Sequence, residues 1–159
     1  MKYSIREARK TDMKEVWALI RELAVFEREP EAVEVKVEDL ERDGFGPKKK
    51  FHCFVAETES GIAGMALVYP RYSTWKGPVI HLEDLIVKEA MRGTGLGSAL
   101  FESVIRYGHE QGVKRICWEV LDWNDPAIAF YESKGARVMR DWDVVQLDEA
   151  AIEAFINKL

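Results

Sequence analysis

Hydrophobic residues in the first third of the chain recur with two different periods. Residues 3–7 alternate between apolar and polar side chains, which is typical of a short strand. From residue 13 the apolar positions follow helical spacing, and Asp12 with Glu15 has the spacing of a capping box at the start of that helix. Residues 31–50 are irregular, with room for one short helix before the turn at residues 43–47. The predicted apolar face of the first helix consists of Met13, Val16, Trp17, Ile20, Leu23 and Ala24.

The middle of the chain has the pattern of paired strands. Residues 51–58 and 62–69 are apolar runs around the turn Glu59-Ser60-Gly61, and residues 78–87 form a third run of the same kind. A helix is then expected from about Gly95 to Gly112. Its predicted buried residues are Leu96, Leu100, Phe101 and Val104.

The last third of the chain continues with alternating strands and helices. We expect a strand over residues 115–121, a helix over 126–135 with Asn124 or Asp125 as its cap, a last strand or pair over 136–147 and a closing helix over 148–159. The order of elements predicts a mixed α/β (α+β) fold, with one twisted central sheet flanked by helices, in a single domain of residues 1–159. The side chains expected to point inward from the closing helix are Ile152, Phe155, Ile156 and Leu159.

Composition narrows the possible functions of this chain. A hydrophobic fraction of 47% with 32% charged residues is that of an ordinary globular protein, and the net charge of −5 argues against nucleic-acid binding and mildly favours a cationic partner. No apolar run is long enough to cross a membrane and no export signal is visible, so we expect no membrane association and a cytoplasmic location. The two cysteines and three histidines lack metal-ligand spacing, and we assign no metal: Cys53, Cys117, His52, His81 and His109.

The most informative stretch runs from Leu85 to Ser98, where a hydrophobic strand leads into a basic, glycine-rich turn that opens a helix. Such a turn points backbone N–H groups at phosphate oxygens, and Arg92 adds a charge-assisted contact. A P-loop is excluded because Gly-Lys-Ser/Thr is absent, and the dinucleotide fingerprint fails because Ser98 stands at its third glycine position. Pyrophosphate binding is therefore favoured over an ordinary strand–helix turn.

The motif Arg92-Gly93-Thr94-Gly95-Leu96-Gly97 resembles the Arg/Gln-x-x-Gly-x-Gly/Ala signature of the GNAT acetyltransferases. Residues 20–24, 43–46, 51–57, 82–85, 122–131 and 134–136 extend this resemblance to the spermidine/spermine N1-acetyltransferase-like subfamily. Residues 72–77, Tyr-Ser-Thr-Trp-Lys-Gly, are closer to its thialysine N-epsilon-acetyltransferase branch. The resemblance covers nearly the whole chain and fades after about residue 137.

This resemblance implies an enzyme that uses acetyl-CoA as co-substrate and acetylates a small-molecule amine by direct transfer in a ternary complex. It also implies a homodimer in which the C-terminal strands pack across the two chains. Asn124 would reach the cofactor, cap the following helix, or do both. The implied cofactor-binding residues are Leu85, Ile86, Val87, Arg92, Gly93, Thr94, Gly95, Leu96, Gly97, Ser98, Asn124, Asp125, Pro126 and Ala127.

Two residues occupy the catalytic positions of the family. Glu83 is the implied general base, acting directly or through a water, although a strand carboxylate can equally be a solvated or ion-paired structural group. Tyr131 is the implied general acid for the CoA thiolate, and its alternative is a simple amphipathic helix position. Asp84 could raise the pKa of Glu83 by repulsion, but strand alternation should send the two side chains to opposite faces.

The family also points to an amine pocket formed by Phe26, Glu27, Trp75, Glu83, Trp118 and Glu119. Aromatic faces and carboxylates suit a cation, but Phe26 and Trp118 can equally be core residues and Glu27 a surface charge. Ser73 and Thr74 stand where polyamine enzymes carry an acid, which favours a shorter amine such as thialysine, a lysine-like amino acid or a diamine. Two alternatives remain open: acetylation of protein lysines or N-termini, and a non-catalytic acetyl-CoA-binding module.

Overall fold

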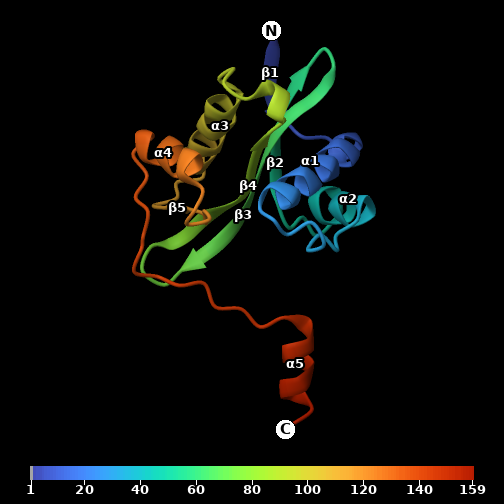
Figure 1. Ribbon diagram of the computed structural model, residues 1–159, viewed down its shortest axis with the longest axis vertical. Coiled ribbons are helices and arrows are strands. Elements are labelled where there is room, and N and C mark those ends of the chain that lie inside the picture. The colour runs from blue at the N-terminus through green and yellow to red at the C-terminus, as the bar shows by residue number, and fades with distance from the viewer. Residues whose placement is uncertain (1) are drawn as a thin grey trace. The chain divides into compact units, whose positions relative to one another are not determined.

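The computed structural model describes residues 2–159 as two compact units (Figure 1). The first unit extends to Glu119 and the second comprises Val120–Leu159. No helix within residues 2–159 combines the length and the apolar character that crossing a membrane requires.

The first unit is built on a five-stranded sheet with the order β1-β2-β3-β4-β5. Its first four strands pair antiparallel along the chain, and β5 pairs parallel with β4, so the predicted mixed sheet is confirmed. The strands are β1 Tyr3–Glu7, β2 His52–Thr58, β3 Gly61–Ser73, β4 Gly77–Val87 and β5 Ile116–Cys117.

The strand predicted at residues 115–121 is wrong in its extent, because only Ile116 and Cys117 join the sheet, opposite Ile80 and His81. The reason lies in β4. Leu82 pairs with Val68 but Asp84 pairs with Leu67, which leaves Glu83 as an extra residue in a β-bulge. A bulge bends its strand and increases its twist, so β4 turns away from β5 just after their last paired residues.

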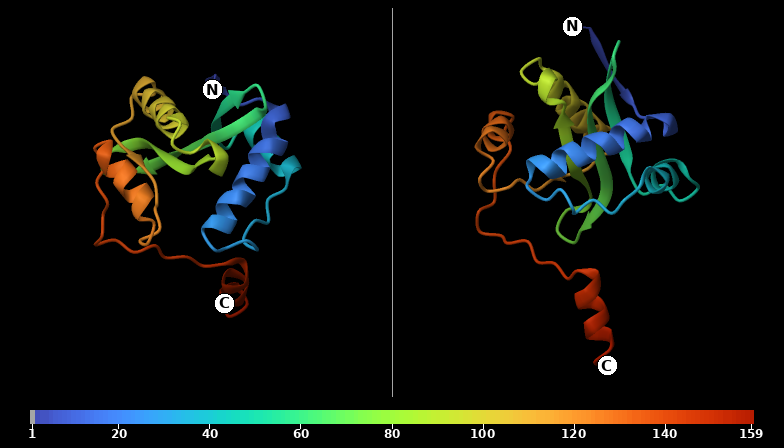
Figure 2. Two further views of the ribbon diagram at one scale, coloured as in Figure 1. Left: turned by 45° about the horizontal axis from the view of Figure 1, so that its top comes forward. Right: turned by 45° about the vertical axis from the view of Figure 1, so that its right-hand side comes forward.

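Helices cover both faces of this sheet (Figure 2). α1 (Met13–Phe26) and α2 (Val37–Phe45) lie over one face, and α3 (Leu96–Glu110) lies over the other. The predicted helices are therefore present, and Met13, Val16 and Leu19 carry most of the buried face of α1. The core on the side of α1 and α2 contains Met13, Val16, Leu19, Leu40, Cys53, Val55, Ile62, Met65, Leu67 and Ile86.

The capping box predicted for α1 is wrong in its contacts, although Asp12 does stand at the N-cap position. The Asp12 carboxylate accepts hydrogen bonds from Arg6 Nη1 at 2.7 Å and from the Arg9 amide at 2.7 Å, in a short 3-10 turn over Lys10–Asp12. Glu15 instead accepts a hydrogen bond from the Ile62 amide at 2.9 Å. The Asp12 carboxylate binds the Arg6 guanidinium and does not cap the first turn of α1, because a charged donor binds a carboxylate more strongly than a neutral amide does.

The second unit contains α4 (Asp125–Ser133) and α5 (Glu149–Ile156). The strand or strand pair predicted over residues 136–147 is wrong, because these residues form no strand. A strand needs a neighbour for its backbone hydrogen bonds, and this unit offers none. The inward orientation predicted for the closing helix is also wrong, since Ile152, Phe155, Ile156 and Leu159 are 50–90% exposed.

Candidate active site

The glycine-rich loop joins β4 to α3 through a 3-10 turn at Glu89–Met91. Gly93 and Gly95 have φ angles of 76° and 89°, a left-handed conformation that favours glycine. A Cβ added to Gly93 would meet no atom within 4 Å, and one added to Gly97 would meet only Val87 Cγ2, at 3.8 Å. The loop therefore leaves open space directly over its own backbone.

Backbone donors gather at the start of α3. Gly95 is its N-cap residue and no side chain caps the helix. The amides of Leu96, Gly97 and Ser98 consequently have no partner within the helix, whose first backbone bond is from the Ala99 amide to the Gly95 carbonyl at 3.0 Å. These amides and the positive end of a 15-residue helix dipole suit a phosphate. Leu96 contributes through its backbone, because its side chain is fully buried.

The side chains of the loop hold it against its surroundings. Thr94 Oγ1 donates to the Met91 carbonyl at 2.6 Å, and Arg92 Nε donates to the Val87 carbonyl at 3.3 Å. The guanidinium of Arg92 also lies over the Phe26 ring, with its central carbon 5.5 Å from the ring centroid. The loop is thus joined to the C-terminal end of α1, where the predicted amine-pocket residues Phe26 and Glu27 lie.

Glu83 stands at the bulge of β4, with a side chain that is 52% exposed. Asp84 is more buried than Glu83, as expected for side chains on opposite faces of the sheet, although the bulge interrupts the regular pairing at this point. Burial, followed by repulsion from Glu83 and Glu27, raises the pKa of Asp84 to about 7. Burial and the charge of Glu83 likewise raise the pKa of Glu27. Three carboxyl groups therefore form one acidic cluster, which can attract a cation.

His81 is buried beside this cluster, with Nε2 3.6 Å from Glu83 Oε2. Its Nδ1 faces Arg71 Nη1 at 3.5 Å and Cys117 Sγ at 3.6 Å. Burial lowers the pKa of His81, and Glu83 opposes that effect while Arg71 adds to it. Arg71 was not among the predicted site residues, because it lies two residues beyond the predicted strand 62–69 and no local motif marks it.

Tyr69 and Glu119 complete this neighbourhood. The Tyr69 ring centroid lies 5.1 Å from that of His81. Burial first, and then the charge of Glu83 and a hydrogen bond to it, raise the pKa of Tyr69. Glu119 is close enough to influence the pKa values of both Tyr69 and His81. The charges of Glu83 and Glu119 thus act on the same two groups, Tyr69 and His81, and the charge of Glu83 also acts on Glu27.

The predicted aromatic pocket residues lie in different places. Trp118 packs edge-on against Phe101 of α3, with ring centroids 5.6 Å apart. Trp75 is 79% exposed at the tip of the β3–β4 hairpin, where Ser73 Oγ accepts a hydrogen bond from its amide at 3.2 Å. Gly77, at the base of that tip, is six strand residues from Glu83, or about 20 Å along β4. The chain therefore does not bring Trp75 to its own Glu83.

The second unit holds the remaining predicted residues. Asn124 Oδ1 accepts a hydrogen bond from the Ala127 amide at 3.4 Å, so its predicted capping role is confirmed, with Pro126 in the first turn of the helix. Asp125 begins α4 and is exposed. Tyr131 is half-buried near the end of α4, with its ring centroid 5.5 Å from that of Phe130.

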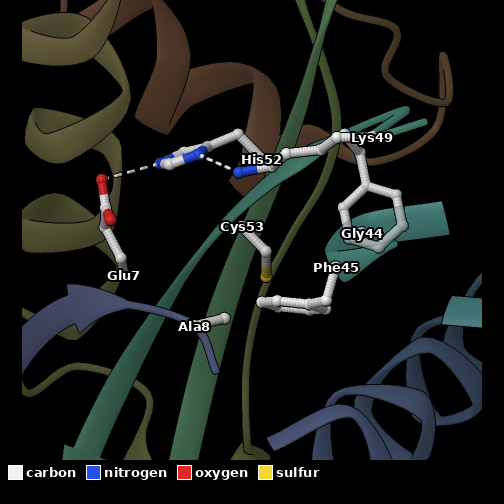
Figure 3. Close-up of a pocket in the computed structure, with 8 residues that line it drawn as sticks. Glu7, Ala8, Gly44, Phe45, Lys49, His52 and Cys53 are labelled. Carbon is white, nitrogen blue, oxygen red and sulfur yellow. Dashed lines mark hydrogen bonds and ion pairs between the residues drawn. The ribbon is translucent and has the colours of Figure 1, made fainter. Parts of the chain in front are cut away.

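A small cavity elsewhere in the first unit has a volume of about 30 Å³, which is room for one water and too little for a substrate (Figure 3). The His52 side chain lines this cavity, and its ring stacks on that of Tyr107 with ring centroids 4.6 Å apart. His52 Nε2 lies 3.3 Å from Glu7 Oε1 without forming a hydrogen bond. Within residues 2–159, no group of three or more acidic, histidine or cysteine side chains is arranged to hold a metal ion. The cavity is lined by Glu7, Ala8, Gly44, Phe45, Lys49, Phe51, His52 and Cys53.

Comparison with known proteins agrees with this geometry. The model of the acetyltransferase (GNAT) family matches residues 3–136. The chain is 36% identical over 165 residues to thialysine N-epsilon-acetyltransferase of Bos taurus, covering 97% of both proteins. It is 33% identical over 132 residues to L-ornithine N5-acetyltransferase of Arabidopsis thaliana, covering 82% of this chain and 54% of that protein.

Among solved structures, an integron cassette protein from the mobile metagenome of V. cholerae is similar with a TM-score of 0.79. The two chains are 20% identical and 98% of each is covered, so this likeness concerns the fold alone. The family match over residues 3–136 and the relative that is 36% identical along 97% of the chain show that this protein belongs to the GNAT acetyltransferase family and is an N-acetyltransferase.

Proposed function

We propose that this protein transfers the acetyl group of acetyl-CoA to the primary amine of a small cationic molecule, by direct transfer in a ternary complex. The observation that carries the proposal is a single strand, β4, which leads into a glycine loop with an uncapped helix start and bears Glu83 near other carboxyl groups. Candidate acceptors are thialysine, a lysine-like amino acid, a diamine or a polyamine. The relatives named for thialysine and ornithine support this class of substrate.

The residues of the loop fit the cofactor. The unpartnered amides of Leu96, Gly97 and Ser98 would bind the diphosphate, and the open space over Gly93 would admit it. Arg92 would add a cation. Acetyl-CoA supplies the activated acyl thioester. The remaining proposed contacts are the backbone of Leu85, Ile86 and Val87, Thr94 and Gly95 of the loop, and Asn124, Asp125, Pro126 and Ala127 of the second unit.

Glu83 and Tyr131 would carry the proton transfers. The Glu83 carboxylate accepts a proton from the substrate ammonium, directly or through a water, and the free amine attacks the acetyl carbonyl carbon. The C–N bond forms as the C–S bond breaks. Tyr131 would donate its phenolic proton to the departing thiolate, and the second proton, which the nitrogen loses as the amide forms, would restore the phenol. Glu83 would release the first proton to solvent. The exposure of the Glu83 side chain supports its access to the substrate.

Negative charge around Glu83 would select the cationic acceptor. Glu27 and Glu119 lie in the same electrostatic neighbourhood as Glu83, and Phe26 lies beside them at the end of α1. Trp118, adjacent to Glu119, would line the same pocket. The uncharged Ser73 and Thr74 at the hairpin tip favour an acceptor shorter than a polyamine.

An amine panel tests this function most directly. Purified protein, acetyl-CoA and single amines from lysine analogues to spermine should release free CoA with at least one short amine, and mass spectrometry should find that amine acetylated. Glu83→Gln is the matched control with strongly reduced activity, because it keeps the size of the side chain. Absence of turnover with every amine would refute the proposed function.

We further propose that the protein works as a homodimer in the cytoplasm. The apolar side chains exposed in the second unit suggest an uncovered contact surface, and Trp75 lies too far from its own Glu83 to serve the same site. Two unpaired cysteines fit a reducing compartment. Sedimentation equilibrium should give twice the mass of the 18.3 kDa chain. The exposed apolar residues of this surface are Met139, Trp142, Val144, Val145, Leu147, Ile152, Phe155, Ile156 and Leu159.

A further inference from the structure

Arg71 is an exposed cation beside an acidic site, and the proposed acetyl transfer does not use it. Its Nη1 approaches His81 Nδ1 at 3.5 Å and Cys117 Sγ at 3.9 Å. Neither neighbour neutralises it. Within residues 2–159, no carboxylate lies within ion-pair distance of its guanidinium, whereas Arg6, Arg42 and Arg106 each have an acidic partner. Arg71 thus keeps N–H donors that a ligand can use.

We propose that Arg71 binds the carboxylate of the acceptor substrate, so that the enzyme favours amino acids bearing a side-chain amine over simple diamines and polyamines. This inference rests on the proposed function and narrows its substrate class. The guanidinium presents two parallel N–H donors that match a carboxylate, which makes arginine the usual partner for that group.

The order of groups along β4 supports this assignment. Arg71 pairs with Val79, which is eight strand residues, or about 26 Å, from Val87 at the glycine loop. Arg71 therefore lies too far from the loop to bind the same diphosphate. Glu83 lies between the two cations. A cofactor anchored at the loop reaches Glu83 from one side, and an acceptor amine at Glu83 extends along the strand toward Arg71.

The spacing admits a lysine-like amino acid whose side chain is bent. The His81 ring bridges the two groups, with 3.5 Å on the Arg71 side and 3.6 Å on the Glu83 side. The guanidinium and the Glu83 carboxylate thus lie within about 10 Å of each other. The terminal nitrogen and the carboxylate of a lysine-like amino acid are about 7 Å apart when extended, and a hydrogen bond of about 3 Å at each end brings the span to about 13 Å. The acceptor therefore binds both groups only with its side chain bent.

His81 holds Arg71 in this place. A guanidinium can only donate, so the 3.5 Å contact with Arg71 is a hydrogen bond in the His81 tautomer that carries its proton on Nε2, toward Glu83. Burial favours this neutral ring. The arrangement also disfavours competitors, since the second ammonium of a diamine would lie beside a cation instead of a partner of opposite charge.

Matched substrate pairs test the proposal. Ornithine and putrescine, and thialysine and its decarboxylated form, differ only in the carboxylate. The intact enzyme should have a higher kcat/KM for each amino acid than for its decarboxylated partner. Arg71→Gln should lower kcat/KM for the amino acids by about 10- to 100-fold, mainly through KM, and leave or raise the value for the diamines. Arg71→Lys keeps the charge but loses the paired donors. Its kcat/KM for the amino acids should lie between those of the intact enzyme and Arg71→Gln.

Arg106→Gln is the control for loss of one positive charge, because Arg106 is exposed on α3 and pairs with Glu102 of the same helix. Arg106→Gln should leave kcat/KM unchanged for both substrates of each matched pair. Equal losses for both members in Arg71→Gln, or a preference of the intact enzyme for the decarboxylated amines, would overturn the role of Arg71 alone. Failure of the intact enzyme to acetylate any amine would instead refute the proposed function, and this inference with it.

Discussion

The helices α3 and α5 have similar apolar patterns but opposite surroundings. On α3, the residues Leu96, Leu100 and Val104 are fully buried against the sheet of the first unit. On α5, the residues Ile152, Phe155 and Ile156 are half or more exposed. An apolar stripe thus gives a helix its periodicity, but only an opposing surface makes that stripe part of a core. The first unit supplies its own surface, and the second lacks one.

A charged substitution on each helix should give the largest difference between them, measured as the loss of folding stability. Leu100→Asp should destabilise the fold by about 4 kcal/mol, because it places an unpaired charge among apolar side chains. Ile156→Asp should change the stability of the single chain by less than about 0.5 kcal/mol, since that residue is 60% exposed. Urea denaturation measures both.

The same pair also tests the dimer. If α5 is covered by a second copy, Ile156→Asp should shift the sedimentation of the protein toward the single chain without unfolding it. A large loss of single-chain stability in Ile156→Asp would show that α5 does have an intramolecular partner.

The chemistry assigned to the first unit is tested by Glu83→Gln. Removing a general base should lower kcat about 100- to 1,000-fold near neutral pH. The loss should shrink as the pH rises, because an amine that is already deprotonated needs no base. A rate profile from pH 6 to 10 measures this, and a loss that is the same at every pH would leave Glu83 with a binding role only.

The second unit enters the chemistry through Tyr131. Tyr131→Phe removes the phenolic proton and keeps the ring, so kcat should fall about 10- to 100-fold while the KM for acetyl-CoA stays nearly constant. Steady-state kinetics with varied acetyl-CoA separates the two parameters. Unchanged turnover would remove Tyr131 from the proposed mechanism.

The glycine loop offers the smallest expected effect and a close control. Gly93 and Gly112 both have positive φ angles, 76° and 70°, and a Cβ on either would meet no atom within 4 Å. Gly93→Ala and Gly112→Ala should therefore cost similar stability, about 1 kcal/mol each. Only Gly93→Ala should raise the KM for acetyl-CoA, by about 10-fold, and an equal rise in both variants would argue against diphosphate binding at this loop.

Much of the first unit could be predicted from the sequence. The strand around residues 78–87, the glycine loop and the helix after it agree with β4 and α3 within one or two residues. The Asn124 cap was also predicted, since it depends on a residue three positions away. Such features follow from interactions between near neighbours in the chain, which a sequence displays directly.

The failed predictions involve residues that need distant partners. Asp12 was expected to cap α1, but Arg6 and Arg9 take its carboxylate. The strand at residues 115–121 stops after Cys117 because β4 bends at Glu83. Arg71 escaped notice because nothing near it in the sequence is acidic or catalytic, and its position matters only when His81 and Cys117 come beside it.

The sequence by itself determined the kinds and order of most elements, the glycine loop and the family, because each depends on local spacing or on a motif. Only the tertiary structure decided which carboxyl groups gather around Glu83, which cation faces them, and which apolar stripe is buried. Those properties depend on burial and electrostatic interaction between residues tens of positions apart. Neither effect exists until the chain has folded.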